Sequence, residues 1–121
     1  MATFDDVRRL TGDLPMVEEG TSYGTPSMKV KAKSFCRMWS EREHDRDDVH
    51  DTEVLVVFCE VEEKEAILDS SRAVFETPHY HGHGAFLVRL ADVDLDELAD
   101  HLEHSYRQKA PKTALKLLDA E

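Results

Sequence analysis

The chain has 121 residues, a length that suits one domain spanning residues 1–121 with a single hydrophobic core. Its 26 acidic and 15 basic residues give a net charge of −11, which opposes long-range attraction to a polyanion such as nucleic acid. The apolar runs are shorter than the roughly 18 residues that span a bilayer, so we expect no membrane-spanning segment.

The N-terminal segment and the cysteines indicate a compartment. The segment MATFDDVRRL is acidic and has no apolar stretch, so it does not have the pattern of a signal peptide, and we expect a cytoplasmic protein. Cys36 and Cys59 lie in separate apolar runs without CxxC spacing. In a reducing cytosol, two such cysteines are expected to be buried thiols rather than a disulfide.

A helix is predicted at the start of the chain. Thr3 and Asp6 have a spacing close to that of a capping box, in which the first side chain caps the helix and the second reaches back. Phe4, Val7 and Leu10 then fall on one face, as in an amphipathic helix. A glycine and a proline follow within five residues of Leu10, and we expect the helix to end there.

Strands joined by tight turns are predicted between residues 17 and 40. Met28 and Val30 alternate with lysines, which is typical of a half-buried strand, and the sequence KAK at 31–33 predicts a hairpin tip. Alternation places three side chains of the returning strand on one face: Phe35, Arg37 and Trp39. Cys36 and Met38 are expected on the other face.

The segment EREHDRDDVHDTE, residues 41–53, has the lowest complexity in the chain. It holds seven acidic residues and two arginines. This composition indicates a solvated loop between strands. The next stretch, EVLVVFCEV at 53–61, is almost entirely apolar and rich in valine, which predicts a central strand covered on both faces.

The second half of the chain alternates helices and strands. A short helix is expected at EEKEAILDSS, then an extended segment and a glycine-containing turn, then a strand at GAFLVRL. Asp94 and Glu97 have the capping-box spacing for a long last helix, and PKTALKLLDA forms a final turn or short helix. The resulting order α-β(3)-α-β(2)-α, with short connections, predicts an α+β fold with an antiparallel sheet packed against helices.

Two stretches of this sequence resemble the MmcQ/YjbR family. The first is LPMVEEGTSYGTPSMKVKAKSF at 14–35, and the second is VFETPHYHGHGAFLVRLADVDLDEL at 74–98. The resemblance runs from about Phe4 to Pro111. It implies an antiparallel sheet with helices, similar to secretion chaperones and described as a double-winged arrangement. It also implies DNA binding, a function predicted for the family from its shape.

The most unusual pattern is a run of alternating histidines at 79, 81 and 83. On a regular strand they would point to one side and could hold zinc. Gly82 and Gly84 instead favour a turn, which separates the side chains, so we predict a polar turn without a metal. His79 lies within the TPHY sequence of the family-like stretch. We therefore predict that His79 is a ligand-binding residue or a partly buried, hydrogen-bonded polar residue.

Four cations cluster on or near the predicted hairpin: Lys29, Lys31, Lys33 and Arg37. A hairpin tip carrying lysines can contact a phosphate backbone, and Arg37 between two aromatic residues can stack on a base. We therefore predict these four residues as candidate nucleic-acid contacts. The alternative interpretation is that lysines on an edge strand prevent sheet-to-sheet aggregation.

No sequence motif of a known catalytic class is present. The chain lacks the GxSxG, HExxH, Walker and dinucleotide-binding patterns, and its carboxylates lie in runs typical of solvated surfaces. We predict a non-enzymatic binding module that requires no cofactor. The resemblance implies weak DNA binding, and the alternative is a protein-interaction module that uses the sheet face or the acidic surface.

Overall fold

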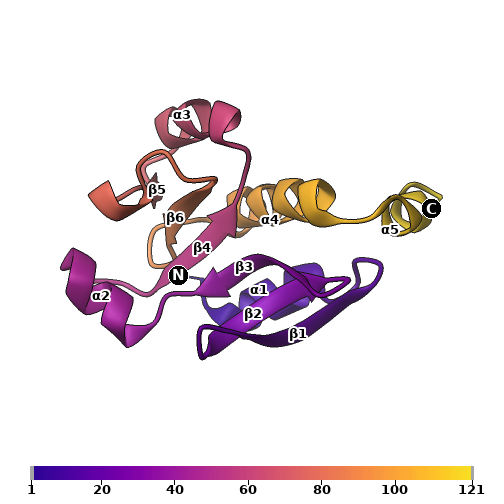
Figure 1. Ribbon diagram of the computed structural model, residues 1–121, viewed down its shortest axis with the longest axis horizontal. Coiled ribbons are helices and arrows are strands. Elements are labelled where there is room, and N and C mark those ends of the chain that lie inside the picture. The colour runs from indigo at the N-terminus through magenta and orange to yellow at the C-terminus, as the bar shows by residue number, and fades with distance from the viewer. Residues whose placement is uncertain (1, 121) are drawn as a thin grey trace.

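The computed structural model describes residues 2–120, which form one six-stranded antiparallel sheet and its covering helices (Figure 1). The strands are β1 (Val17–Ser22), β2 (Thr25–Val30), β3 (Lys33–Met38), β4 (Val54–Phe58), β5 (Val74–Phe75) and β6 (Ala85–Arg89). The helices are α1 (Phe4–Thr11), α2 (Glu41–Asp47), α3 (Val61–Ser70), α4 (Leu95–Lys109) and α5 (Lys112–Asp119), with a 3₁₀ turn η1 (Pro78–Tyr80). The strands lie in the order β1-β2-β3-β4-β6-β5, so the predicted antiparallel α+β class is confirmed.

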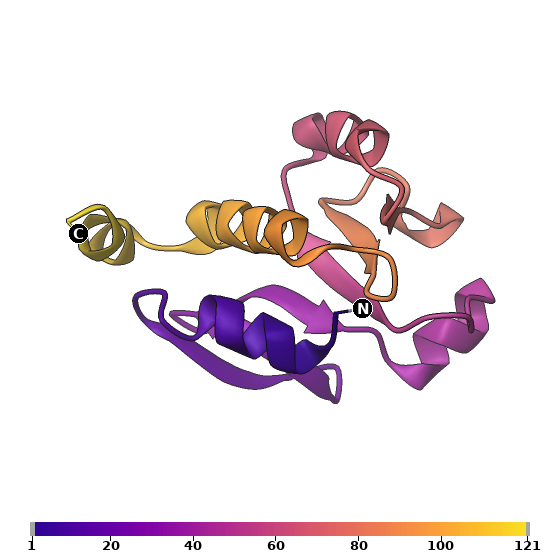
Figure 2. The same cartoon turned by 180° about the vertical axis from the view of Figure 1, so that it is seen from behind.

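The main core lies between one face of the sheet and helices α1 and α4, which run side by side across it (Figure 2). Val7 of α1 and Leu98 of α4 are fully buried against the sheet. Tyr106 of α4 is also fully buried, and its ring meets Phe35 of β3 edge to face at 5.8 Å. Cys36 and Cys59 are free, buried thiols in the same core, and burial raises the pKa of Cys36 to about 12.

The predicted face pattern of β3 is wrong at Phe35. Cys36 is paired with Met28 and Ser34 with Lys29, so Phe35 has no partner on β2 and forms a β-bulge. A bulge inserts one extra residue into a strand and shifts the alternation of its side chains. Phe35 therefore joins Cys36 in the main core, whereas Trp39 belongs to a separate cluster on the opposite face.

The acidic segment contains a helix, so the prediction of a loop throughout residues 41–53 is wrong. Helix α2 begins after Ser40, whose hydroxyl accepts a hydrogen bond from the Glu43 amide, while the Glu43 carboxylate accepts one from the Ser40 amide. This reciprocal capping box satisfies backbone N–H donors in the first turn of α2. The added stabilisation matters because a helix of this length is unstable in isolation. The C-terminal segment, predicted as a turn or a short helix, is helix α5.

The second face of the sheet is covered only in part. A small cluster that includes Trp39, Val56 and Tyr80 lies over β4 and β6, beneath α2 and η1. Within residues 2–120, no helix crosses this face over β1 to β3 (Figure 1). No helix in the same range has both the length and the apolar character needed to cross a membrane. The partial cover leaves a hollow between α2, η1 and the β1–β2 turn.

Candidate ligand-binding pocket

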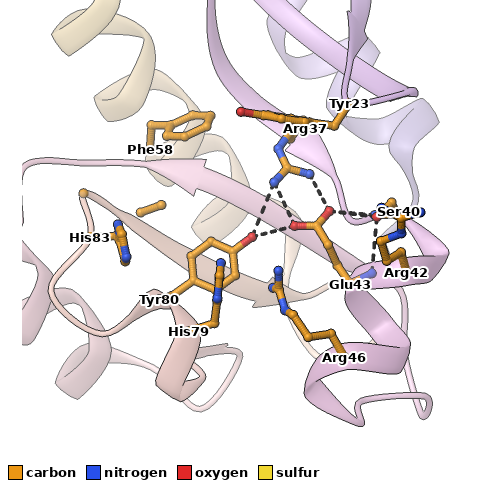
Figure 3. A pocket seen from close by; sticks show the side chains of 12 residues that line it. Tyr23, Arg37, Ser40, Arg42, Glu43, Arg46, Phe58, His79, Tyr80 and His83 are labelled. Atoms are coloured by element: carbon orange, nitrogen blue, oxygen red, sulfur yellow. Dashed lines mark hydrogen bonds and ion pairs between the residues drawn. The ribbon is translucent and has the colours of Figure 1, made fainter.

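A pocket of about 720 Å³ occupies this hollow on the second face of the sheet. Its lining comes from four parts of the chain: the β1–β2 turn, the end of β3 with α2, the end of β4, and residues 79–85. Most of its charged and aromatic side chains are shown in Figure 3: Tyr23, Arg37, Arg42, Glu43, Arg46, Phe58, His79, Tyr80 and His83. Glu43 is the one carboxylate in this lining, beside three guanidinium groups.

A buried ion pair forms the floor of the pocket. Both terminal nitrogens of Arg37 donate to the Glu43 carboxylate, at 2.7 and 2.8 Å, and the two residues are 7% and 8% exposed. The Tyr80 hydroxyl donates to Glu43 at 2.8 Å and accepts from the Trp39 indole at 3.0 Å. The side chains come from β3, α2 and η1, so the network joins three elements that are distant in sequence.

The network fixes the charge of each member. Burial alone raises the pKa of Glu43, but hydrogen bonds from Arg37, the Ser40 amide and Tyr80 outweigh it and bring the pKa to about 2. The hydrogen bonds to Glu43 raise the pKa of Arg37, and burial raises the pKa of Tyr80. At neutral pH the floor therefore consists of a carboxylate, a guanidinium and a neutral phenol. The short Arg37–Glu43 distances are those expected for charge-assisted hydrogen bonds.

One donor in this floor has no partner. Among buried side-chain nitrogens and oxygens of residues 2–120, only the Arg37 Nε lacks a hydrogen bond. Leaving a buried donor unsatisfied costs about 1 to 3 kcal/mol. The Tyr23 ring lies over the guanidinium, 4.9 Å from its centre, and remains 84% exposed. Tyr23 reaches this position because it and Gly24 both have positive φ angles, 54° and 77°, in the turn between β1 and β2.

The three histidines do not converge on one point. The predicted turn is confirmed, because η1 and a following turn replace a regular strand. His81 points to Glu76, with its Nδ1 2.9 Å from the carboxylate, while the His79 and His83 rings stack 6.1 Å apart and line the pocket. His79 is exposed rather than partly buried. Within residues 2–120, no group of three or more potential ligands is arranged to hold a metal ion.

A buried lysine holds this turn in place. Lys64 of α3 is only 4% exposed, and its ammonium donates to the carbonyls of Tyr80 and His83. It also pairs with the Glu76 carboxylate at 2.9 Å. These three contacts satisfy all three ammonium donors, which a buried lysine requires. Lys64 therefore sets the path of the backbone that carries His79 and His83 to the pocket.

Replacing Lys64 with methionine is expected to lower the free energy of unfolding by about 1 to 3 kcal/mol, because two buried carbonyls lose their donor. Urea denaturation followed by circular dichroism measures this loss. The same substitution at Lys116, an exposed position on α5, is the matched control and should change stability by less than about 0.5 kcal/mol. Equal effects for Lys64→Met and Lys116→Met would contradict the role of Lys64.

The structure separates the four predicted cations. The hairpin tip is confirmed: Lys31 and Ala32 form its turn with φ angles of 52° and 69°, and Lys31 and Lys33 are exposed. Lys29 lies half-buried on β2, with its side chain against Gly20 of β1. Arg37 is instead buried at the other end of β3 and paired with Glu43. Its guanidinium is covered by Tyr23, not flanked by Phe35 and Trp39 on one face.

The comparisons with known proteins place this fold. An antiparallel six-stranded sheet with helices on one face and a partly open second face defines a class of α+β domain, not an activity. The chain belongs to the YjbR family, whose model matches residues 12–108.

Its relatives carry no assigned activity in their names. The uncharacterized proteins Mb2600 of Mycobacterium bovis and Rv2570 of Mycobacterium tuberculosis are each 30% identical to this chain over an alignment of 124 positions, gaps included. The alignment covers 93% of this chain and 92% of theirs. The crystal structure of Deinococcus radiodurans protein DR2400, a DUF419 domain, matches with a TM-score of 0.65 and 22% identity. That match covers 88% of this chain and 77% of the other, and it supports the fold alone.

Proposed function

We propose that the protein is a non-enzymatic binding module that contacts the DNA backbone weakly through lysines at the β2–β3 turn. The observation that carries this proposal is that none of Lys29, Lys31 and Lys33 forms an ion pair with any residue from 2 to 120. Most arginines in the same range do: Arg8, Arg9, Arg37, Arg46, Arg89 and Arg107. An ammonium without a carboxylate partner can approach a phosphate without first breaking an internal contact.

Helix α5 adds cations at the same end of the molecule. Lys112 and Lys116 of α5 are exposed. The Thr113 hydroxyl contacts the Met16 sulfur just before β1, and β1 pairs with β2 up to the residue preceding the turn. The β2–β3 turn and α5 lie at one end of the sheet in both views (Figures 1 and 2). We call Lys29, Lys31, Lys33, Lys112 and Lys116 the lysine end.

The net charge and the pocket set the limits of this function. A background of −11 opposes approach to DNA, so binding is weak and falls steeply with salt. The one carboxylate in the lining of the pocket, Glu43, is held by Arg37 and Tyr80 and is not free to act as a base. The proposed role is therefore non-enzymatic. We also propose that the protein is cytoplasmic, because two free, buried thiols suit a reducing compartment.

Fluorescence anisotropy with labelled duplex DNA at low salt tests the proposal. We expect saturable binding in the micromolar range for the wild type. Replacing Lys29, Lys31 and Lys33 with glutamate should abolish it, because three phosphate contacts become repulsive. The control replaces Arg9, Arg42 and Arg72 with glutamate and makes the same change in net charge at exposed positions outside the lysine end. Equal loss in both variants, or no saturation at about 100 µM wild-type protein, would contradict the proposal.

The alternative class of partner is another protein. The face of β1 to β3 that no helix within residues 2–120 crosses is the surface that such a partner would contact (Figure 1). Such a partner would not depend on the lysine end. An absence of saturable DNA binding at low salt would therefore favour this alternative.

A further inference from the structure

We propose that the Arg37 pocket binds a small organic anion: a molecule with a phosphate or carboxylate group attached to a flat ring, the chemistry of a mononucleotide. This site is separate from the lysine end, because the pocket lies beside the β1–β2 turn and the lysines lie at the β2–β3 turn. Its volume of about 720 Å³ is within the range of roughly 300 to 1,000 Å³ typical of small-molecule sites.

The unpartnered Nε of Arg37 is the first argument for a ligand. Arg37 lies within the lining with its terminal nitrogens occupied by Glu43, and its Nε is left without an acceptor. Buried donors are satisfied in nearly all folded proteins, so we expect a ligand oxygen to reach this one once the exposed Tyr23 ring, which lies over the guanidinium, moves aside. Because Glu43 already balances the Arg37 charge, Arg37 supplies the ligand with a hydrogen bond, and the charge of a bound anion is balanced by other cations of the lining, chiefly Arg42.

The charge around the opening is the second argument. Arg42 forms no ion pair with residues 2–120, and Arg46 pairs with Asp47 at 3.0 Å while lying 5.9 Å from the Tyr80 ring. His79 and His83 add two imidazoles on the opposite side (Figure 3). Glu43 balances Arg37 and Asp47 balances Arg46, so Arg42 adds one uncompensated positive charge beside the two imidazoles. This local charge favours an anion, in a molecule whose net charge is −11.

The aromatic side chains indicate the rest of the ligand. Tyr23 is 84% exposed, although its ring lies over a buried guanidinium, and Phe58 lines the same side of the pocket (Figure 3). Exposed aromatic faces beside cations favour a flat ring, and each stacking contact with a base contributes about 1 to 3 kcal/mol. The pocket thus combines aromatic side chains that can stack on a flat ring with cations that can bind an anion. An inorganic anion would contact the cations but not the aromatic side chains.

Adenosine 5′-monophosphate is the probe for this site, and adenosine and inorganic phosphate are the matched controls. The single tryptophan, Trp39, belongs to the Tyr80 hydrogen-bond network, so its fluorescence reports on the pocket floor. We expect saturable quenching by the nucleotide in the micromolar to millimolar range, with adenosine and phosphate at least about tenfold weaker. In NMR spectra, the Arg37 Nε–H resonance should shift downfield as it gains an acceptor.

Two variants leave the buried network intact. Arg42→Gln and Tyr23→Asn change exposed side chains, and asparagine tolerates the positive φ at position 23. Each should weaken the nucleotide by about five- to tenfold, whereas Arg72→Gln should leave it unchanged. The triple lysine-to-glutamate variant should still bind the nucleotide, which separates this proposal from DNA binding. Absence of saturable quenching up to about 10 mM, or affinity unaffected by both pocket variants, would overturn it.

Discussion

Replacing Glu43 with alanine is expected to lower the free energy of unfolding by about 3 to 5 kcal/mol, since it removes one partner of a buried ion pair. The variant leaves the Arg37 guanidinium buried without its carboxylate, and the Tyr80 hydroxyl loses its acceptor. It also removes the carboxylate that accepts from the Ser40 amide at the start of α2. Chemical denaturation followed by circular dichroism and Trp39 fluorescence measures the loss.

Two comparisons separate the ion pair from a general effect on α2. Glu41→Ala, at an exposed position in the same first turn, should change stability by less than about 0.5 kcal/mol. The double variant Arg37→Met/Glu43→Leu should recover most of the loss, because an apolar pair of similar volume replaces the charges. A loss for Glu43→Ala no larger than for Glu41→Ala would contradict the described network.

The same pair predicts how stability depends on pH. The folded pKa of Glu43 is about 2, below its ordinary value of 4.5, so its contribution is present above pH 4.5. That contribution should fall as the pH drops from about 5 toward 2, because the unfolded chain takes up the proton first. In Glu43→Gln this part of the acid dependence should be absent, and an unchanged pH profile would contradict the lowered pKa.

Replacing Phe35 with alanine is expected to cost about 3 to 5 kcal/mol, the range for a large aromatic side chain removed from a packed core. Phe35 is fully buried at the bulge in β3 and meets the Tyr106 ring of α4. Its carbonyl also accepts a hydrogen bond from the Ser105 hydroxyl. The alanine variant leaves a cavity between sheet and helix, and urea denaturation measures its effect.

The Phe35→Leu variant is the matched comparison, since it keeps most of the apolar volume. We expect it to lose less than half of what Phe35→Ala loses. Position 35 would instead be exposed if the strand alternated without a bulge and its second face were open. A loss below about 1 kcal/mol for Phe35→Ala would therefore contradict the position of the bulge.

Local signals explain what the sequence predicts well. The capping pair Thr3 and Asp6, the KAK turn at 31–33 and the valine-rich strand at 53–61 each depend on neighbouring residues, and each element is present. Their side chains carry enough information within a few positions to specify a helix start, a hairpin or a buried strand.

Two errors have identifiable physical causes. In residues 41–53 the density of charge outweighed the capping-box pattern of Ser40 and Glu43, which was the available signal for a helix. On β3, strict alternation hid the bulge, because a bulge depends on pairing with β2 and not on the local pattern.

The pocket could not be predicted because its parts meet only in the folded sheet. Glu43 follows Tyr23 by 20 residues and Tyr80 follows Glu43 by 37, and strand pairing and Lys64 bring the three side chains together. For the same reason the sequence groups Arg37 with the hairpin cations, because its partner Glu43 lies in a segment whose composition predicts a loop. Of the five predicted site residues, Arg37 and His79 line the pocket, and the three lysines do not.

The salt dependence of DNA affinity tests the proposed function most directly. Each phosphate contact made by a lysine contributes about 0.9 to the slope of log affinity against log salt. Replacing Lys29, Lys31 and Lys33 with glutamine removes three charges without adding repulsion, so the slope should become shallower by about 2 to 3 relative to the wild type. A slope identical in the two proteins would show that these lysines do not contact phosphates and would contradict the account.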